Sequence, residues 1–135
     1  PATAVGEVHD LGAILAELVA RYCPDATPVQ AVWGRPRSSA RRGRYRSIRM
    51  GVYLYDEGMI RIHPALDAPW VPRYFVAWVL YHELLHHVVP ATERDGRRWH
   101  HGEEFRRREA LFAERDVALA WERENVRRLI ASRDG

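Results

Sequence analysis

Cysteine is nearly absent, since Cys23 is the single one in 135 residues. An internal disulfide is therefore excluded, and so is a zinc knuckle or ribbon built on pairs of cysteines. Long apolar runs are also missing, because no stretch approaches the roughly 20 residues that a membrane-spanning helix needs. The first residues show no basic segment followed by an apolar one, so no signal peptide is visible and a cytoplasmic location is expected.

Acidic residues are absent from the segment between Arg35 and Arg49, although the net charge of the chain is only +3. Such a run of arginines indicates either a solvated basic loop or a patch for phosphates. Tyr45 and Ile48 interleave with the arginines, which suits phosphate contact combined with base stacking. The candidate nucleic-acid-binding residues are Arg35, Arg37, Arg41, Arg42, Arg44 and Arg46.

Apolar residues at helical spacing predict helices near both ends of the chain and in its middle. The first helix is expected at about 8–22, with Asp10 as its N-cap. A second is expected at 73–89 and ends before Pro90. One or two further helices are expected from about Glu103 onward.

Alternating apolar residues predict a small sheet between the first and second helices, which makes the expected fold α+β. Strands are expected at 29–33, 47–55 and 59–63, the last two joined by a turn. We expect them to form a three-stranded, mainly antiparallel sheet. The polar stretches 34–46 and 91–100 are expected to be loops.

The second predicted helix carries the sequence HELLH at residues 82–86. Four residues advance a helix by about 400° and about 6 Å, so His82 and His86 lie on one face. A catalytic zinc ion binds such imidazoles and keeps a position open for water, whose proton Glu83 is placed to accept. This is the HExxH pattern of zinc peptidases, and the apolar helix around it favours a metal site over two partly buried histidines.

The motif alone does not fix the third ligand of such a site. The extended metzincin pattern needs Gly and His where this chain has Val89 and Thr92, so that class is excluded. His87 points about 100° away from His86 around the helix and is a poor partner. The remaining candidates lie downstream and are His100, His101, Glu104 and Glu109.

HELLHH, followed by a polar loop and then HHGEEF, resembles the SprT-like metallopeptidases, the family that includes Spartan. The matching residues are His82, Glu83, His86, His101, Gly102 and Phe105. The resemblance covers roughly residues 45–110 and implies a zincin-like fold. The length of the chain predicts one domain over residues 1–135, with the first helix and sheet in 1–68 and the motif helix and later helices in 69–135. The resemblance also implies one zinc ion, with His101 as third ligand. His100 remains the first alternative, and a carboxylate of Glu104 or Glu109 the second. A histidine before a helix, followed by Gly, can turn toward the motif helix while Phe105 anchors the turn.

In a site of this kind, bound zinc lowers the pKa of its water toward about 7, and Glu83 accepts the proton and passes it to the leaving amine. The peptide is expected to lie along an exposed edge of the sheet, where backbone groups are unpaired. The sequence does not assign a hydrogen-bond donor for the scissile carbonyl. The candidates are Tyr74, Tyr53 and Arg98.

Spartan-type enzymes act on proteins bound or crosslinked to DNA, so the resemblance implies DNA-associated substrates and a DNA contact through the arginine-rich segment. A second hypothesis is a zinc-bearing module that binds nucleic acid or a partner protein with little hydrolysis. Glu83 argues against it, because a structural zinc site needs no base and closes with four protein ligands. A zinc-dependent nucleobase deaminase is a weaker idea, since its PCxxC element is missing.

Overall fold

A small mixed sheet forms the base of the computed structural model, which describes residues 2–35 and 48–134. Its strands are β1 (Gln30–Trp33), β2 (Gly51–Leu54) and β3 (Met59–Ile62), in the order β1-β3-β2. β2 and β3 are antiparallel, whereas β1 runs parallel to β3. The predicted α+β class is confirmed, but the expectation of a mainly antiparallel sheet is wrong. Alternation predicts strands but does not say which strand of a hairpin accepts a third strand, or in which direction.

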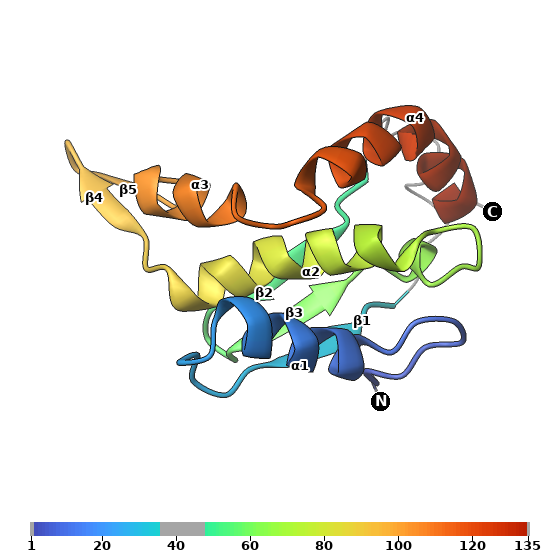
Figure 1. Cartoon of the computed structure of the whole chain (residues 1–135), viewed down its shortest axis with the longest axis horizontal. Coiled ribbons are helices and arrows are strands. Elements are labelled where there is room, and N and C mark those ends of the chain that lie inside the picture. The colour runs from blue at the N-terminus through green and yellow to red at the C-terminus, as the bar shows by residue number, and fades with distance from the viewer. Residues whose placement is uncertain (1, 36–47, 135) are drawn as a thin grey trace.

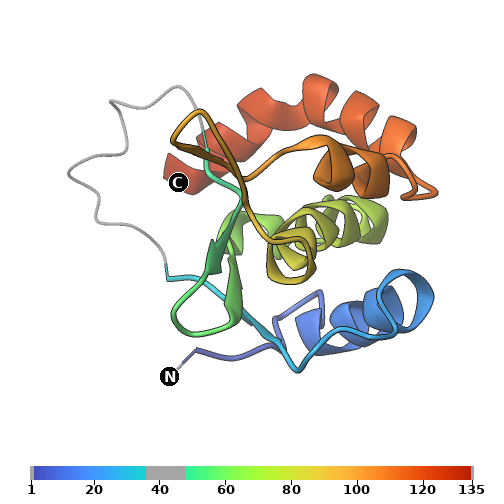
Figure 2. The same cartoon turned by 90° about the vertical axis from the view of Figure 1, so that its left-hand side faces the viewer.

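Two helices, α1 (Leu11–Tyr22) and α2 (Arg73–Val88), pack on the same face of this sheet (Figures 1 and 2). Asp10 is the N-cap of α1, as predicted, and its side chain accepts a hydrogen bond from the backbone N–H of Ala13, so the helix begins at Leu11 rather than at about residue 8. A 3-10 turn, η2 (Pro64–Leu66), connects β3 to the segment before α2. None of the helices in the described ranges is both long and apolar enough to cross a membrane.

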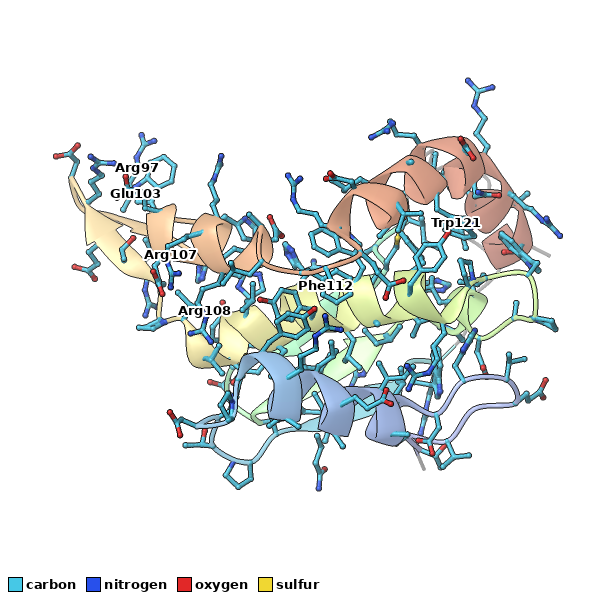
Figure 3. The ribbon with its side chains drawn as sticks, in the orientation of Figure 1. Arg97, Glu103, Arg107, Arg108, Phe112 and Trp121 are labelled. Atoms are coloured by element: carbon cyan, nitrogen blue, oxygen red, sulfur yellow. The ribbon has the colours of Figure 1, made fainter. Side chains whose placement is uncertain are left out.

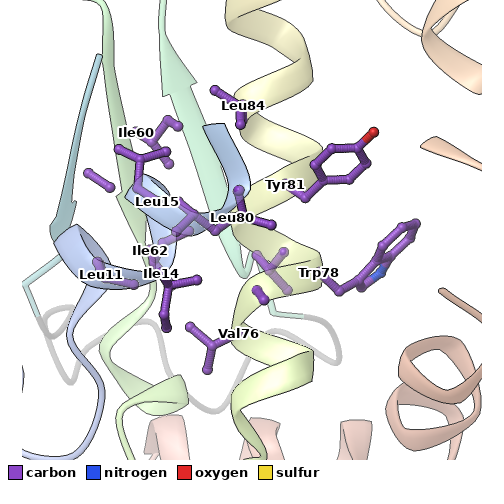
Figure 4. Packing of buried hydrophobic residues seen from close by; sticks show 14 of the residues in the cluster. Leu11, Ile14, Leu15, Ile60, Ile62, Val76, Trp78, Leu80, Tyr81 and Leu84 are labelled. Carbon is purple, nitrogen blue, oxygen red and sulfur yellow. The ribbon is translucent and has the colours of Figure 1, made fainter. Parts of the chain in front are cut away.

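α2 is buried on both sides, which explains why its sequence is apolar nearly all round. Figure 4 shows Val76 and Leu80 directed toward the sheet and α1, while Trp78 and Tyr81 extend from the other side. All four side chains are buried. A helix packed on both sides holds its side chains in fixed directions, so residues 82–86 stand on a rigid support.

The polar stretch after α2 forms a β-hairpin rather than the predicted loop. Its strands are β4 (Thr92–Arg94) and β5 (Arg97–Trp99), joined at Asp95 and Gly96. Both turn residues have positive φ, 53° and 76°, which is the geometry that Asp-Gly favours in two-residue hairpin turns. All the strand residues are exposed, so the apolar alternation that normally marks a strand is missing here.

Two C-terminal helices, α3 (Glu103–Glu109) and α4 (Arg115–Asp134), cover the side of α2 that faces away from α1. Phe112, between them, is buried against Trp78 and Tyr81, and Trp121 of α4 packs on Phe75 (Figure 3). These aromatic contacts attach the C-terminal part of the chain to α2.

The N-terminal segment is held in part by one carboxylate. Asp67 accepts hydrogen bonds from the backbone N–H groups of Glu7, Val8 and His9, at 2.7 to 2.9 Å. Desolvation opposes the ionised form of Asp67, but these three hydrogen bonds outweigh it and hold the pKa of Asp67 below its usual value. A single side chain thus joins residues that lie about 60 positions apart in the sequence.

Candidate metal centre

Three histidines converge between α2 and the segment that precedes α3. His82 and His86 project from one face of α2, as the four-residue spacing predicts, with ring centroids 5.1 Å apart. His101 approaches them so that its Nε2 lies 3.0 Å from Nε2 of His86. One nitrogen from each ring lies within 4.8 Å of the other two, close enough for the three to hold one metal ion.

Phe105 supports all three imidazoles from the first turn of α3. Its ring is buried and lies 4.7 to 5.1 Å, between centroids, from the rings of His82, His86 and His101. Gly102, just before α3, has no side chain to occupy the space beside Thr92. This arrangement agrees with the predicted anchoring role of Phe105 and places His101 rather than His100 in the cluster.

Glu109 fixes the orientation of His82. Its carboxylate lies 2.7 Å from Nδ1 of His82, which leaves Nε2 of that ring to face the other histidines. Desolvation, the largest single effect, opposes a charged His82, but the hydrogen bond with Glu109 and the negative charges of Glu83, Glu109 and Glu122 together outweigh it and raise the pKa of His82. In metal sites, a histidine ligand commonly donates its outer N–H to a carboxylate in this way. The structure therefore gives Glu109, one of the sequence candidates for the third ligand, an orienting position instead.

Tyr55, just beyond β2, connects two histidines on the other side of the cluster. Its hydroxyl lies 3.3 Å from Nδ1 of His86 and 2.9 Å from Nδ1 of His100. Since a hydroxyl has one hydrogen to donate, it can accept from Nδ1–H of His86 while it donates to His100. Burial, followed by the charges of His82 and His101, lowers the pKa of His86 to about 4. His86 is thus neutral at pH 7, the form in which imidazole binds metals.

Glu83 is the buried carboxylate of the site, with 8% of its surface exposed. Burial raises its pKa, although the charges of His82 and Arg49 act in the opposite direction. Its side chain lies against Gly51 of β2, where a Cβ atom would come within 3.0 Å of Cγ and 3.2 Å of Oε2 of Glu83. Gly51 thus permits the close approach of the strand to this carboxylate.

The remaining sequence candidates lie apart from the three-histidine cluster. Tyr53 and Thr27 bind the two nitrogens of His87 at 2.7 and 3.0 Å, so His87 points away from the cluster as predicted. Glu104 is exposed and pairs with Arg107. Tyr74 packs against the hydrophobic core, and Arg98 is on the exposed strand β5.

The arginine-rich segment is described only at its ends. Arg35 and Arg49 are exposed, and Arg49 is close enough to Glu83 to influence its pKa. The other predicted nucleic-acid-binding residues, Arg37, Arg41, Arg42, Arg44 and Arg46, lie outside the described residues.

Comparison with models of known families, with curated proteins and with solved structures gave no match. The function is therefore inferred from the side chains of the site. Two residues that shape the site, Tyr55 and Gly51, were not among the sequence candidates. Tyr55 lies two residues after Tyr53 and so on the same side of an extended segment, but the sequence does not say which side meets the motif helix.

Proposed function

We propose that this protein is a zinc-dependent endopeptidase of the SprT-like type, with one zinc ion held by His82, His86 and His101. The observation that carries the proposal is the convergence of three imidazole nitrogens within 4.8 Å beside the buried carboxylate of Glu83. Three neutral nitrogen ligands are a frequent protein contribution to a catalytic zinc site, in which the fourth position stays open. Zinc, when bound, would supply Lewis acidity and lower the pKa of a water molecule.

Glu83 is the proposed general base. Its neighbour in sequence, His82, is a proposed ligand, so its carboxylate stands beside the metal position on the same helix. Because burial raises its pKa, Glu83 is a stronger base than an exposed carboxylate. It would take a proton from the attacking water and deliver it to the leaving amine.

The peptide substrate would lie along β2. This strand is at an edge of the sheet, and at Gly51 it passes directly beside Glu83. An extended peptide that paired with this edge would place its backbone next to the catalytic carboxylate. Tyr55, just after the same strand, would orient His86 through its hydroxyl.

A zinc-bearing module without hydrolytic activity is the alternative. A purely structural zinc site normally has four protein ligands and no adjacent base. Here the cluster in the described residues has three histidines, His100 is engaged by Tyr55, and Glu83 is buried at the site. These features favour an open, catalytic centre.

DNA-associated proteins are the proposed substrates, on the basis of the resemblance and of the arginine-rich segment. If that segment binds phosphates, affinity for single-stranded DNA should fall steeply with salt and should be lost when Arg41, Arg42 and Arg44 are replaced by Ala. Retained affinity in that triple variant would exclude the patch.

The central test combines metal content with proteolysis. Purified wild-type protein should bind about one zinc ion per chain and cleave casein or itself. The proteolysis assay is run both in the presence and in the absence of single-stranded DNA. Glu83→Gln should keep its zinc and lose proteolysis, whereas His101→Ala should lose zinc and His100→Ala should keep it. Full proteolysis by Glu83→Gln would refute the assignment of the base, and zinc loss confined to His100→Ala would refute the choice of His101.

A further inference from the structure

A polar pocket opens directly beside the three-histidine cluster. It has a volume of about 320 Å³ and is lined by His82, His101, Phe105, Arg106, Glu109 and Arg115. Two of these residues are proposed metal ligands, so a group that enters the pocket would lie beside whatever is bound at the metal. We call this space the arginine pocket.

The direction of Arg106 into the pocket follows from the geometry of α3. Arg106, Arg107 and Arg108 are consecutive, and successive helical residues point about 100° apart. Arg107 pairs with Glu104, and Arg108 reaches toward the end of α1, where it contacts Sγ of Cys23 at 3.4 Å (Figure 3). Arg106 donates a hydrogen bond from Nε to the carbonyl oxygen of His101 at 3.1 Å. Within the described residues, its terminal nitrogens have no hydrogen-bond partner.

Arg115 provides the second cation from the start of α4. It contacts Asp116, its neighbour in sequence, whose side chain is 95% exposed, and such a pair contributes little in water. The one carboxylate in the pocket lining, Glu109, is engaged by His82. The pocket lining therefore has two guanidinium groups and one carboxylate, and that carboxylate is already bound to His82. This leaves an excess of positive charge on the pocket wall.

We infer that the arginine pocket binds a carboxylate of the substrate, supplied by an acidic side chain near the scissile bond or by the C-terminus of the chain. Guanidinium groups are suited to carboxylates because their N–H groups match the two oxygens in a planar, bidentate arrangement. The buried ring of Phe105 contributes an apolar surface to the pocket lining. This inference rests on the proposed peptidase function and adds a substrate preference to it.

Matched peptides test the inference. A series of quenched fluorescent peptides should carry Glu at one position around the cleavage site, a different position in each peptide. Each has a partner peptide with Gln at the same position. Glu at the position that reaches the pocket should raise kcat/KM about tenfold over Gln. A second pair, with free and amidated C-termini, separates the two sources of the carboxylate. Binding of the same peptides to zinc-loaded Glu83→Gln protein, followed by fluorescence anisotropy, should show the same preference without turnover.

Variants connect the preference to the pocket. Arg115→Gln and Arg106→Gln should each abolish most of the preference for Glu over Gln peptides. Arg115→Glu should make the enzyme prefer a peptide with Lys at that position. Arg123→Gln removes an exposed arginine of α4 outside the pocket lining and is the matched control. Thermal unfolding and zinc content verify that each variant is folded and loaded.

Four outcomes decide between the claims. Cleavage of the Glu and Gln peptides at equal rates, with equal binding, would overturn the pocket inference and leave the peptidase function standing. A preference that survives in both single variants and in Arg115→Glu would also overturn it. Failure to cleave any peptide, with binding that still depends on the carboxylate and on Arg115, would refute the peptidase function and support the pocket. A preference lost in the pocket variants and kept in Arg123→Gln would support both.

Discussion

At the scale of single residues, each proposed ligand of α2 is held by a partner on its outer nitrogen. Glu109 contacts Nδ1 of His82, and Tyr55 contacts Nδ1 of His86. These contacts leave both Nε2 atoms for the centre of the cluster, so the rings are oriented before any metal binds. Preorganisation of this kind lowers the conformational entropy that metal binding would otherwise cost.

Replacement of Glu109 tests this orientation. Glu109→Gln should weaken zinc binding by roughly 10- to 100-fold, because a neutral amide holds the N–H of His82 less firmly than a carboxylate does. Competition with a chromophoric chelator measures the affinity. Glu104→Gln, on an exposed carboxylate of the same helix, is the control and should change little. Equal zinc affinity in the two variants would contradict the orienting role.

The sequence predicted which residues come together at the site more readily than it predicted what each of them does there. Helical spacing placed His82 and His86 on one face, and the resemblance selected His101, in agreement with the cluster observed. Glu109 was considered as a ligand because carboxylates bind zinc, but its position on Nδ1 of His82 depends on how α3 packs on α2. That packing is a long-range property, which local periodicity does not encode.

At the scale of elements, the exposed β4–β5 hairpin is connected to the sheet side of the site by Tyr55. The Tyr55 hydroxyl, at the end of β2, contacts His100, which directly follows β5. The hairpin itself was missed in the sequence because its strand residues are all exposed, although Asp95-Gly96 is a turn signal. A two-stranded hairpin without a buried face is marginal alone, so its attachments outside the ladder matter.

Tyr55→Phe should therefore loosen this hairpin. Amide hydrogen exchange in residues 92–100 should become faster, since the hydroxyl that contacts His100 is removed. Tyr53→Phe is the matched control, because the Tyr53 hydroxyl contacts His87 and not the hairpin. In Tyr53→Phe, hydrogen exchange in residues 92–100, measured by mass spectrometry, should be the same as in the wild type. Unchanged exchange in Tyr55→Phe would mean that the turn and ladder alone hold the hairpin.

At the scale of the whole molecule, contacts between distant segments hold the ends of the chain on the central helix. Asp67 secures the N-terminal segment through three backbone N–H groups. At the other end, Arg128 of α4 lies 3.9 Å above the ring of Trp70, which stacks on Trp121. Both attachments use the connection between β3 and α2, so this short segment stabilises each end of the fold.

Asp67 makes stability depend on pH in a defined direction. Because its pKa is held below the usual value of 3.8, ionised Asp67 favours the folded state. That contribution is complete above pH 3.8 and is lost as the pH falls through the lower pKa of the folded state. At pH 7, Asp67→Asn should lower the free energy of unfolding by about 1 kcal/mol or more.

Thermal or denaturant unfolding at pH 7 and near pH 3 measures this effect. The difference between wild-type protein and Asp67→Asn should shrink at the lower pH, where Asp67 begins to take up a proton in the folded state as well. Asp25→Asn, on an exposed side chain in the turn after α1, should match the wild type at both values. A difference between wild type and Asp67→Asn that does not vary with pH would show that packing, not charge, is responsible.

The close approach of Gly51 to Glu83 also predicts which residues homologues of this chain should retain at these two positions. A larger residue at this position would crowd the carboxylate, because Cβ would meet Cγ of Glu83 at 3.0 Å and the Glu83 side chain would have to shift by a few tenths of an ångström. If the proposed peptidase function is correct, selection should therefore favour glycine at this position, independently of the metal ligands. Among homologues of this chain, glycine at the start of the edge strand should be retained wherever the glutamate of the motif is retained. Lineages that have lost the glutamate should be free to vary at both positions, so the pair would mark where the proposed activity was retained.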